Sequence, residues 1–179
     1  MAHTVLPPEL VEAGRRVVEE NRAAGRRIAV AESCTGGLVS AAITAIPGSS
    51  DVFEGGLVTY SNELKARVLN VSTDVLETFG AVSIATAWSM AQGLIEVTEA
   101  DVGVAITGVA GPAGGTERKP VGTVVFARAE RGADPQHVVA DSRHFDVEGR
   151  GEIQLQAALC ALELLLPGPS ELEDAPAAP

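Results

Sequence analysis

The order of predicted elements indicates an α/β protein, a three-layer α/β/α sandwich with a mixed parallel and antiparallel sheet. Helices and short apolar strands alternate in the first half of the chain, which favours parallel strands. Near the end, two strand-like segments follow each other through a short polar turn, which favours antiparallel pairing. The 179 residues are 46% hydrophobic and 21% charged, as expected for one well-buried globular domain.

The first half of the chain predicts alternating helices and strands. Pro7 and Pro8 stand at the start of a predicted helix, where proline is tolerated, and Gly25 ends it. The pair Gly55-Gly56 inside an apolar run indicates a bulge or a close approach of the backbone to a ligand. The expected elements are a helix over 7–24, a strand over 27–32, a helix over 38–46 and a strand over 52–60.

Serine residues mark the helix starts of the second half. Ser61, either Ser72 or Thr73, and Ser83 each precede a helical pattern and are expected as N-caps. The expected helices cover 62–69, a short segment to 79, 83–100 and 149–166, and the expected strands cover 102–107, 121–128 and 138–145. Residues 1–167 are predicted to form a single domain, and residues 168–179, rich in Pro, Ala and Glu, a disordered tail.

Charge and residue usage exclude several classes of function. The net charge of −11 argues against nucleic-acid binding, which needs clustered Lys and Arg. Two cysteines make neither a disulfide framework nor a Cys-rich zinc site. Neither the carboxylates nor the three histidines form a metal-ligand cluster, so no metal and no cofactor are expected. No signal-like segment and no long apolar run occurs, which predicts a cytoplasmic protein without membrane contact.

The segment AESCTGG at 31–37 is the first candidate for chemistry. A strand ends there, and two glycines let the backbone come close as a helix begins, which suits a phosphate or an oxyanion. Ser33 stands where a nucleophile can be held rigidly. The alternative is a simple capping turn with Thr35 as N-cap. Cys34 has no histidine in a nearby motif to activate it, so it is the weaker nucleophile.

Tyr60 and Lys65 form the second candidate. The chain has 11 Arg but only two Lys, Lys65 and Lys119, and Tyr60 is its only tyrosine. Lys can act as a base when its pKa is depressed, whereas Arg cannot, so at least one of the two lysines is expected to have a chemical role. Serine, lysine and tyrosine together can activate a hydroxyl without histidine. The alternative is that Lys65 is a solvated helix residue.

The segment ITGVAGPAGGTERKPVG at 106–122 is the third candidate. It carries many glycines, but a strand rather than a helix follows it, so it is not a dinucleotide-binding loop. It also lacks the Gly-Lys-Ser/Thr of a P-loop. A rigid loop of backbone N–H groups can still line a ligand pocket.

Taken together, these segments resemble the C-terminal domain of the CinA competence/damage-inducible family, in its standalone form as a nicotinamide mononucleotide (NMN) deamidase. The matching strings are AESCTGG, PGSS followed by F-x-GG-x-V-x-YSN-x-x-K, GAVS, and ITGVAGPAGGTERKPVGTV. They run from about residue 8 to residue 166, and their combination is highly specific although no single string is.

The resemblance implies the hydrolysis of NMN to nicotinic acid mononucleotide and ammonia, in pyridine nucleotide recycling. It makes Ser33 the nucleophile, with Lys65 and Tyr60 as its activating partners. It also implies that further motif positions line the pocket, namely Thr35, Gly36, Gly37, Ser49, Asn62, Thr107 and Gly108. The substrate phosphate is expected to bind the backbone N–H groups of the helix start at 35–37 and the side chain of Arg150.

One segment departs from the family pattern. The family usually shows F-x-G-D-R-x-x-V-R before the last helix, whereas this chain reads FDVEGRGEIQ, with Gln154 where the second Arg would be. If that Arg holds the phosphate, this protein binds NMN weakly or has lost the activity. The second hypothesis is therefore a non-catalytic regulatory or partner-binding protein linked to competence or DNA damage. The apolar helices exceed what one sheet needs, which predicts a homodimer.

Overall fold

The sheet has five strands in the order β2-β1-β3-β4-β5, and its mixed pairing confirms the predicted fold class. The computed structural model describes residues 4–134 and 138–168. β1 pairs in parallel with β2 and β3, whereas β3 with β4 and β4 with β5 pair antiparallel. The strands are β1 (Ile28–Glu32), β2 (Phe53–Val58), β3 (Val102–Gly108), β4 (Thr123–Glu130) and β5 (Val139–His144).

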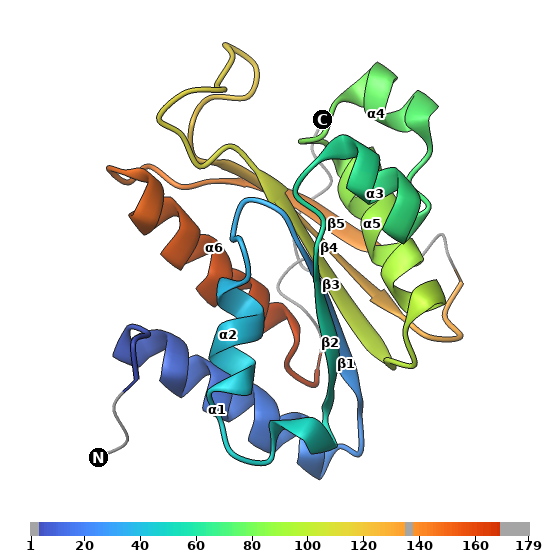
Figure 1. The fold of residues 1–179 in the computed structure, drawn as a ribbon, viewed down its shortest axis with the longest axis vertical. Coiled ribbons are helices and arrows are strands. Elements are labelled where there is room, and N and C mark those ends of the chain that lie inside the picture. The colour runs from blue at the N-terminus through green and yellow to red at the C-terminus, as the bar shows by residue number, and fades with distance from the viewer. Residues whose placement is uncertain (1–3, 135–137, 169–179) are drawn as a thin grey trace.

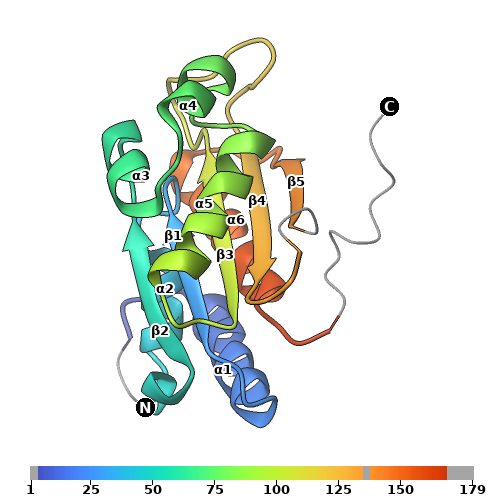
Figure 2. The same ribbon diagram turned by 90° about the vertical axis from the view of Figure 1, so that its right-hand side faces the viewer.

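Helices cover both faces of this sheet, so the molecule has three layers (Figures 1 and 2). One face carries α1 (Pro8–Ala23), α2 (Leu38–Thr44) and α6 (Arg150–Leu164). The other face carries α3 (Asn62–Leu69), α4 (Thr73–Phe79) and α5 (Ile84–Val97). A short 3₁₀ helix, η1 (Ser49–Asp51), connects α2 to β2 and was not predicted.

Two glycines let neighbouring helices lie close together. A Cβ atom at Gly14 of α1 would lie 2.3 Å from the carbonyl oxygen of Ala42 in α2. A Cβ atom at Gly93 of α5 would lie 1.8 Å from the carbonyl oxygen of Leu69 in α3. Neither distance is sterically allowed, so any side chain at these positions would force the helices apart.

The predicted serine N-caps are confirmed. The side chains of Ser61, Ser72 and Ser83 accept hydrogen bonds from backbone N–H groups in the first turns of α3, α4 and α5. Of the two candidates for α4, Ser72 is therefore the cap. Each bond satisfies an N–H group that has no partner within its helix, which fixes where the helix begins.

The boundaries of α5 and β4 differ from the prediction. α5 ends at Val97 rather than near residue 100, because Thr98 is extended with φ −121° and ψ 169°. Arg131 satisfies carbonyls there by donating to Ile95 O at 2.8 Å and to Ala100 O at 3.0 Å. β4 covers 123–130 rather than 121–128, since Gly122 has a φ of +97° and ends the preceding turn.

The predicted irregularity at the Gly-Gly pair is confirmed on β2. The register with β1 shifts between Ile28 and Ala29, which pair with Phe53 and Gly55. A Cβ atom at Gly56 would lie 1.9 Å from Ser40 Oγ on α2, so this glycine lets α2 approach the sheet. The strand ends at Val58, two residues earlier than predicted, which leaves residues 59 and 60 free to turn towards α3.

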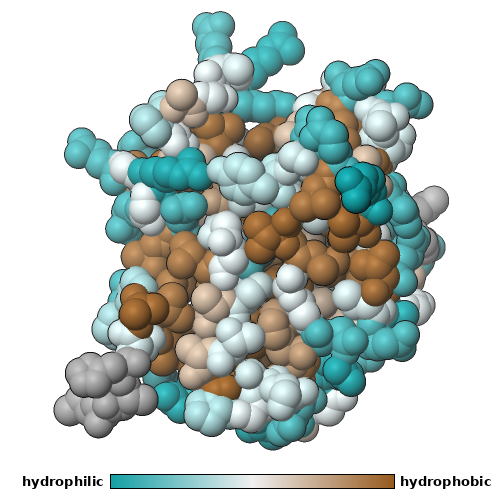
Figure 3. All heavy atoms as spheres, in the orientation of Figure 1, coloured by the Kyte–Doolittle hydropathy of each residue, from teal (hydrophilic) through white to brown (hydrophobic). Residues whose placement is uncertain are grey.

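Part of the apolar surface is exposed. Figure 3 shows hydrophobic residues gathered on both sides of a paler central band, on the face viewed in Figure 1. Such surface is typical of protein–protein contacts, and the homodimer stays a prediction. Within 4–134 and 138–168, no helix is both long and apolar enough to span a membrane. The domain boundary after residue 167 also stays a prediction, and residues 169–179 of the expected tail lie outside the described residues.

Candidate active site

The carboxyl ends of β1, β2 and β3 meet at one edge of the sheet, and the three candidate motifs follow these ends (Figure 1). Ser33 follows β1, Tyr60 and Lys65 follow β2, and Thr107 lies near the end of β3. In parallel strands all carboxyl ends point the same way, so segments far apart in the sequence converge there.

Ser33 and Lys65 are brought together as predicted. Lys65 Nζ lies 3.1 Å from Ser33 Oγ, 2.8 Å from the carbonyl oxygen of Thr59 and 3.4 Å from that of Tyr60. Lys65 comes from the first turn of α3 and is only 1% exposed, so the alternative of a solvated helix residue is wrong. Because β2 stops at Val58, both carbonyls of the following residues can turn to this amine.

Burial lowers the pKa of Lys65 from its ordinary value of 10.5. A neutral amine has two N–H donors and one lone pair. When the two donors bond to the carbonyls of Thr59 and Tyr60, the lone pair is left for the hydroxyl proton of Ser33. This geometry allows Lys65 to take the hydroxyl proton of Ser33, which is the requirement for a serine nucleophile without histidine.

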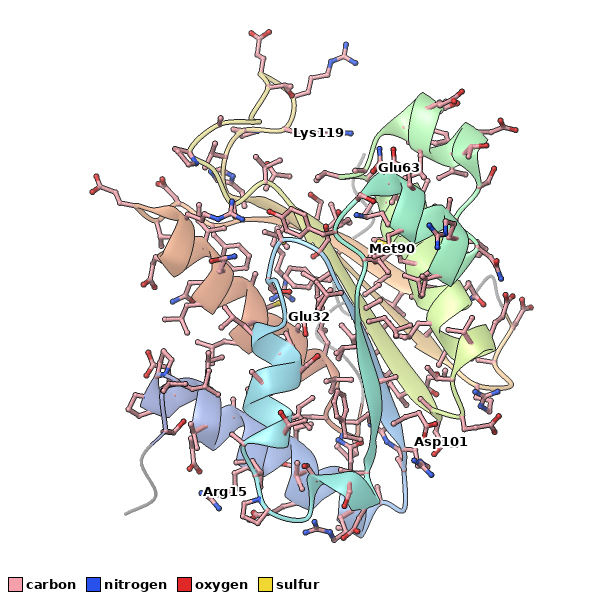
Figure 4. All side chains as sticks on the ribbon, in the orientation of Figure 1. Arg15, Glu32, Glu63, Met90, Asp101 and Lys119 are labelled. Atoms are coloured by element: carbon pink, nitrogen blue, oxygen red, sulfur yellow. The ribbon has the colours of Figure 1, made fainter. Side chains whose placement is uncertain are left out.

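Glu32 holds the end of the turn that contains Ser33 (Figure 4). Its carboxylate is fully buried and accepts hydrogen bonds from the N–H groups of Gly37, Val39 and Ser40 at 2.9, 3.3 and 2.9 Å, and from Ser40 Oγ at 2.7 Å. The start of α2 is therefore capped by Glu32, and Thr35 is not its cap. Of the N–H groups at 35–37 that were expected to bind the substrate phosphate, that of Gly37 is taken by Glu32 and that of Gly36 by Ser33 O, so the expectation stays a prediction for Thr35 only.

The middle of the same turn is held by α6. Gln154 Nε2 donates to the carbonyl oxygen of Cys34 at 2.8 Å. Thr35 is 1% exposed, and in the described part of the chain neither its Oγ1 nor its N–H has a hydrogen-bond partner. Such groups are rare inside proteins and point to an acceptor or donor that arrives with a ligand.

Cys34 is a poor nucleophile in this structure. Its side chain is buried, and burial raises the pKa of the thiol to about 12. The thiol therefore stays protonated at neutral pH, and the thiolate is the nucleophilic form. This agrees with the choice of Ser33 over Cys34.

The hydroxyl of Tyr60 is bonded to Arg150 rather than to the Ser33–Lys65 pair. Arg150 Nη2 donates to it at 2.9 Å, and Arg150 Nη1 donates to the carbonyl oxygen of Gly111 at 2.9 Å. No hydrogen bond joins the Tyr60 hydroxyl to Ser33 or Lys65 among the residues described, and Tyr60 is 59% exposed. Tyr60 reaches Lys65 through its backbone carbonyl only, while its ring and Arg150 form a rim of the site.

The other predicted pocket residues are spread more widely. Asn62 is exposed at the start of α3, and Thr107 Oγ1 donates to the carbonyl oxygen of Ala81 at 2.8 Å. Gly108 packs on β4, since a Cβ atom there would lie 2.8 Å from Thr123 O. Gly36 and Gly37 have φ of +62° and +101°, which the turn requires. Ser49 opens η1, before the amino end of β2, and so lies at the opposite edge of the sheet from Ser33.

The loop between β3 and β4 is tied to α4. Lys119 Nζ donates to the carbonyl oxygen of Phe79 at 2.8 Å, at the end of α4 (Figure 4). Lys119 therefore acts as a C-terminal cap of a helix, and Lys65 is the lysine placed for chemistry. Within the described ranges, no group of three or more His, Cys, Asp or Glu side chains is placed to hold a metal ion.

Sequence reasoning missed the roles of three residues. Glu32 carried a signal, because an acidic residue at a buried strand end directly before a helix start is suited to capping it. Gln154 stood out only as a departure from a family pattern. Thr59 contributes its carbonyl, and a backbone role of this kind leaves no trace in residue type.

Comparison with known proteins gives one consistent result. The model of the family described as CinA C-terminal domain matches residues 11–167. A CinA-like protein of Thermotoga neapolitana is 46% identical over 151 residues, which are 84% of this chain and 35% of that protein. One from Mycobacterium avium is 50% identical over 143 residues, 79% of this chain and 33% of that protein. The chain thus spans about a third of the length of these curated relatives.

Solved structures give the same result. The competence/damage inducible protein CihA from Agrobacterium tumefaciens is 43% identical and superposes with a TM-score of 0.84, covering 91% of this chain and 97% of that one. A CinA superfamily protein from Klebsiella pneumoniae is 35% identical, with a TM-score of 0.81 over 87% of this chain and 94% of that one.

Proposed function

The chain belongs to the CinA C-terminal domain family, and we propose that it is an amidohydrolase that converts NMN and water to nicotinic acid mononucleotide and ammonia. The names of its relatives say only CinA-like or competence-damage inducible. The observation that carries the proposal is the hydrogen bond between Ser33 Oγ and the buried amine of Lys65.

In the first half of the reaction, Lys65 Nζ takes the proton of Ser33 as Oγ bonds to the amide carbon. The electron pair of the C=O bond moves to the oxygen, and the unpaired N–H of Thr35 is a candidate donor for this oxyanion. The C–N bond then breaks, Lys65 gives its proton to the departing nitrogen, and ammonia leaves. An ester between Ser33 and the nicotinoyl group remains.

In the second half, water replaces ammonia. Lys65 takes a proton from a water molecule as the water oxygen bonds to the ester carbon. The bond from that carbon to Ser33 Oγ then breaks. Lys65 returns the proton to Ser33, which restores the pair. One buried amine thus serves as base and acid twice, and this requires a pKa below that of a solvated lysine, as the burial of Lys65 provides.

The phosphate needs a cation, because the protein carries a net charge of −11. Glu32 already binds the N–H groups of Gly37, Val39 and Ser40, so these are not available to the phosphate. Arg150 stands at the exposed rim formed with Tyr60 and keeps donors in a planar fork. We therefore assign the side-chain part of phosphate recognition to Arg150.

The test is ammonia release from NMN by the purified protein, with Ser33→Ala and Cys34→Ala as matched variants of adjacent residues. Ser33→Ala should lower kcat by about 10⁴-fold or more, as for other nucleophiles, while the fold is kept. Cys34→Ala should stay within a few fold of the wild type. Folded wild-type protein that releases no ammonia would overturn the proposal and favour a regulatory or partner-binding CinA-like protein.

A further inference from the structure

We propose that Gln154 is a positioning residue, whose side-chain amide orients the peptide between Cys34 and Thr35 so that the Thr35 N–H becomes an oxyanion donor. The inference rests on the proposed Ser33 chemistry and adds a residue to it. It also gives a role to the residue at which this chain departs from the family pattern.

The contact is direct and reaches the middle of the turn. Gln154 Nε2 lies 2.8 Å from the carbonyl oxygen of Cys34, and a Cβ atom added at Gly36 would lie 3.9 Å from the same nitrogen. The amide of Gln154 therefore lies against the turn, and α6 holds a specific carbonyl of it.

Fixing that carbonyl also fixes an N–H group. The peptide between Cys34 and Thr35 is trans, and in a trans peptide the C=O and N–H bonds point in opposite directions. With the carbonyl of Cys34 turned to α6, the N–H of Thr35 points away from α6. Lys65 approaches Ser33 from α3, which covers the other face of the sheet.

The N–H of Thr35 is one of two donors that the turn leaves open among the described residues, and that of Cys34 is the other. The N–H of Ser33 bonds to Ile106 O, that of Gly36 bonds to Ser33 O, and that of Gly37 bonds to Glu32. Thr35 is 1% exposed, and its N–H and its Oγ1 both lack partners within the described residues. A buried donor two residues after the nucleophile is explained if its acceptor is the oxygen that becomes charged during the reaction.

The main test compares two glutamines of the same helix. Gln154→Met removes the donor at nearly constant shape, and Gln156→Met is the control, because Gln156 Nε2 bonds to Glu152 Oε1 at 2.8 Å within α6. For Gln154→Met we expect kcat for NMN to fall about tenfold or more, with KM within about twofold. Gln156→Met should match the wild type in both, and Gln154→Arg, which retains an N–H donor, should keep kcat within about threefold.

A second measurement does not depend on the substrate. A fluorophosphonate reacts with an activated serine and places an oxygen where the oxyanion would form. The rate of Ser33 labelling, followed by mass, should fall about tenfold in Gln154→Met. The pH at which labelling rises should stay unchanged, because that pH reports Lys65. If Gln154 only stabilised the fold, Gln154→Met would lower the melting temperature and leave the labelling rate of the folded protein unchanged.

The outcomes separate this inference from the function. If wild-type Ser33 is labelled and Gln154→Met is labelled as fast as Gln156→Met, Gln154 does not position the turn, and the Ser33–Lys65 chemistry stands without it. If Ser33 is not labelled in the wild type, the nucleophile itself is wrong, and the role of Gln154 falls with it. A slow Gln154→Arg variant with unchanged melting temperature would also contradict the donor argument.

Discussion

Replacing Lys65 by methionine tests the buried base through activity and through stability. Methionine has a similar length and no ionisable group, so it removes the bonds of Nζ to Ser33 and to the carbonyl of Thr59. A general base is worth about 10² to 10⁴ in rate, and we expect kcat for ammonia release to fall by that factor. The pKa of Lys65 lies below 10.5, and the wild-type activity should rise as the pH passes through it. The variant should lack this rise.

The stability effect follows from the direction of the pKa shift. Burial places the pKa of Lys65 in the folded protein below 10.5, its value when solvated. Between these two values the unfolded chain binds more protons than the folded one, so stability rises with pH in this window. The largest slope is about 1.4 kcal/mol per pH unit, which is about 3 to 5 °C in melting temperature for a chain of this length.

The assay is thermal unfolding of the wild type and Lys65→Met at half-unit steps up to pH 10.5. Other groups titrate in the same range, but they are common to both proteins, so the difference between the two curves isolates Lys65. That difference should change with pH in the window and stay flat below it, where Lys65 is protonated in both states. Parallel curves together with a wild-type kcat in the variant would refute the buried amine base.

Three further predictions concern the rim, the thiol and metals. Arg150→Ala should raise KM for NMN about tenfold, since a charge-assisted bidentate contact is worth about 1.5–3 kcal/mol. It should hardly change KM for the nucleoside that lacks the phosphate. An equal rise in KM for both substrates would show that Arg150 has a structural role. Cys34 should resist thiol alkylation at pH 7 in the folded protein, because its thiol pKa is raised to about 12, and rapid labelling by mass would contradict this. Activity should survive EDTA, and a loss reversed by a divalent cation would show a metal requirement.

The fold and the central pair could be predicted because they depend on pattern and topology. Alternating helices and strands followed by antiparallel strands late in the chain favour a mixed sheet, and parallel strands bring their carboxyl ends together. Ser33 and Lys65 both follow such ends, so the order of elements brings them to the same end of the sheet, where Lys65 Nζ lies 3.1 Å from Ser33 Oγ. Ser49 was grouped with them by its motif, yet it precedes β2 and lies at the other edge of the sheet.

The directions of side chains in the turn could not be predicted in the same way. The pattern indicated neither that β2 ends two residues earlier than predicted nor that the Tyr60 hydroxyl bonds to Arg150. Whether the start of α2 is open to a phosphate depends on a single buried carboxylate, that of Glu32. These choices are settled by hydrogen bonds between residues that no periodicity relates.

The carboxylate of Glu32 at the start of α2 also affects how a product would leave. Deamidation turns a neutral amide into an anion beside Ser33, and an open helix start at that place would attract the new charge and retain it. Here the positive end of the helix is already neutralised from within by Glu32. The N–H groups of Gly37, Val39 and Ser40 therefore do not hold the newly formed acid, and the net charge of −11 gives a repulsive field beyond the site. Release of the acid is thereby favoured over its retention.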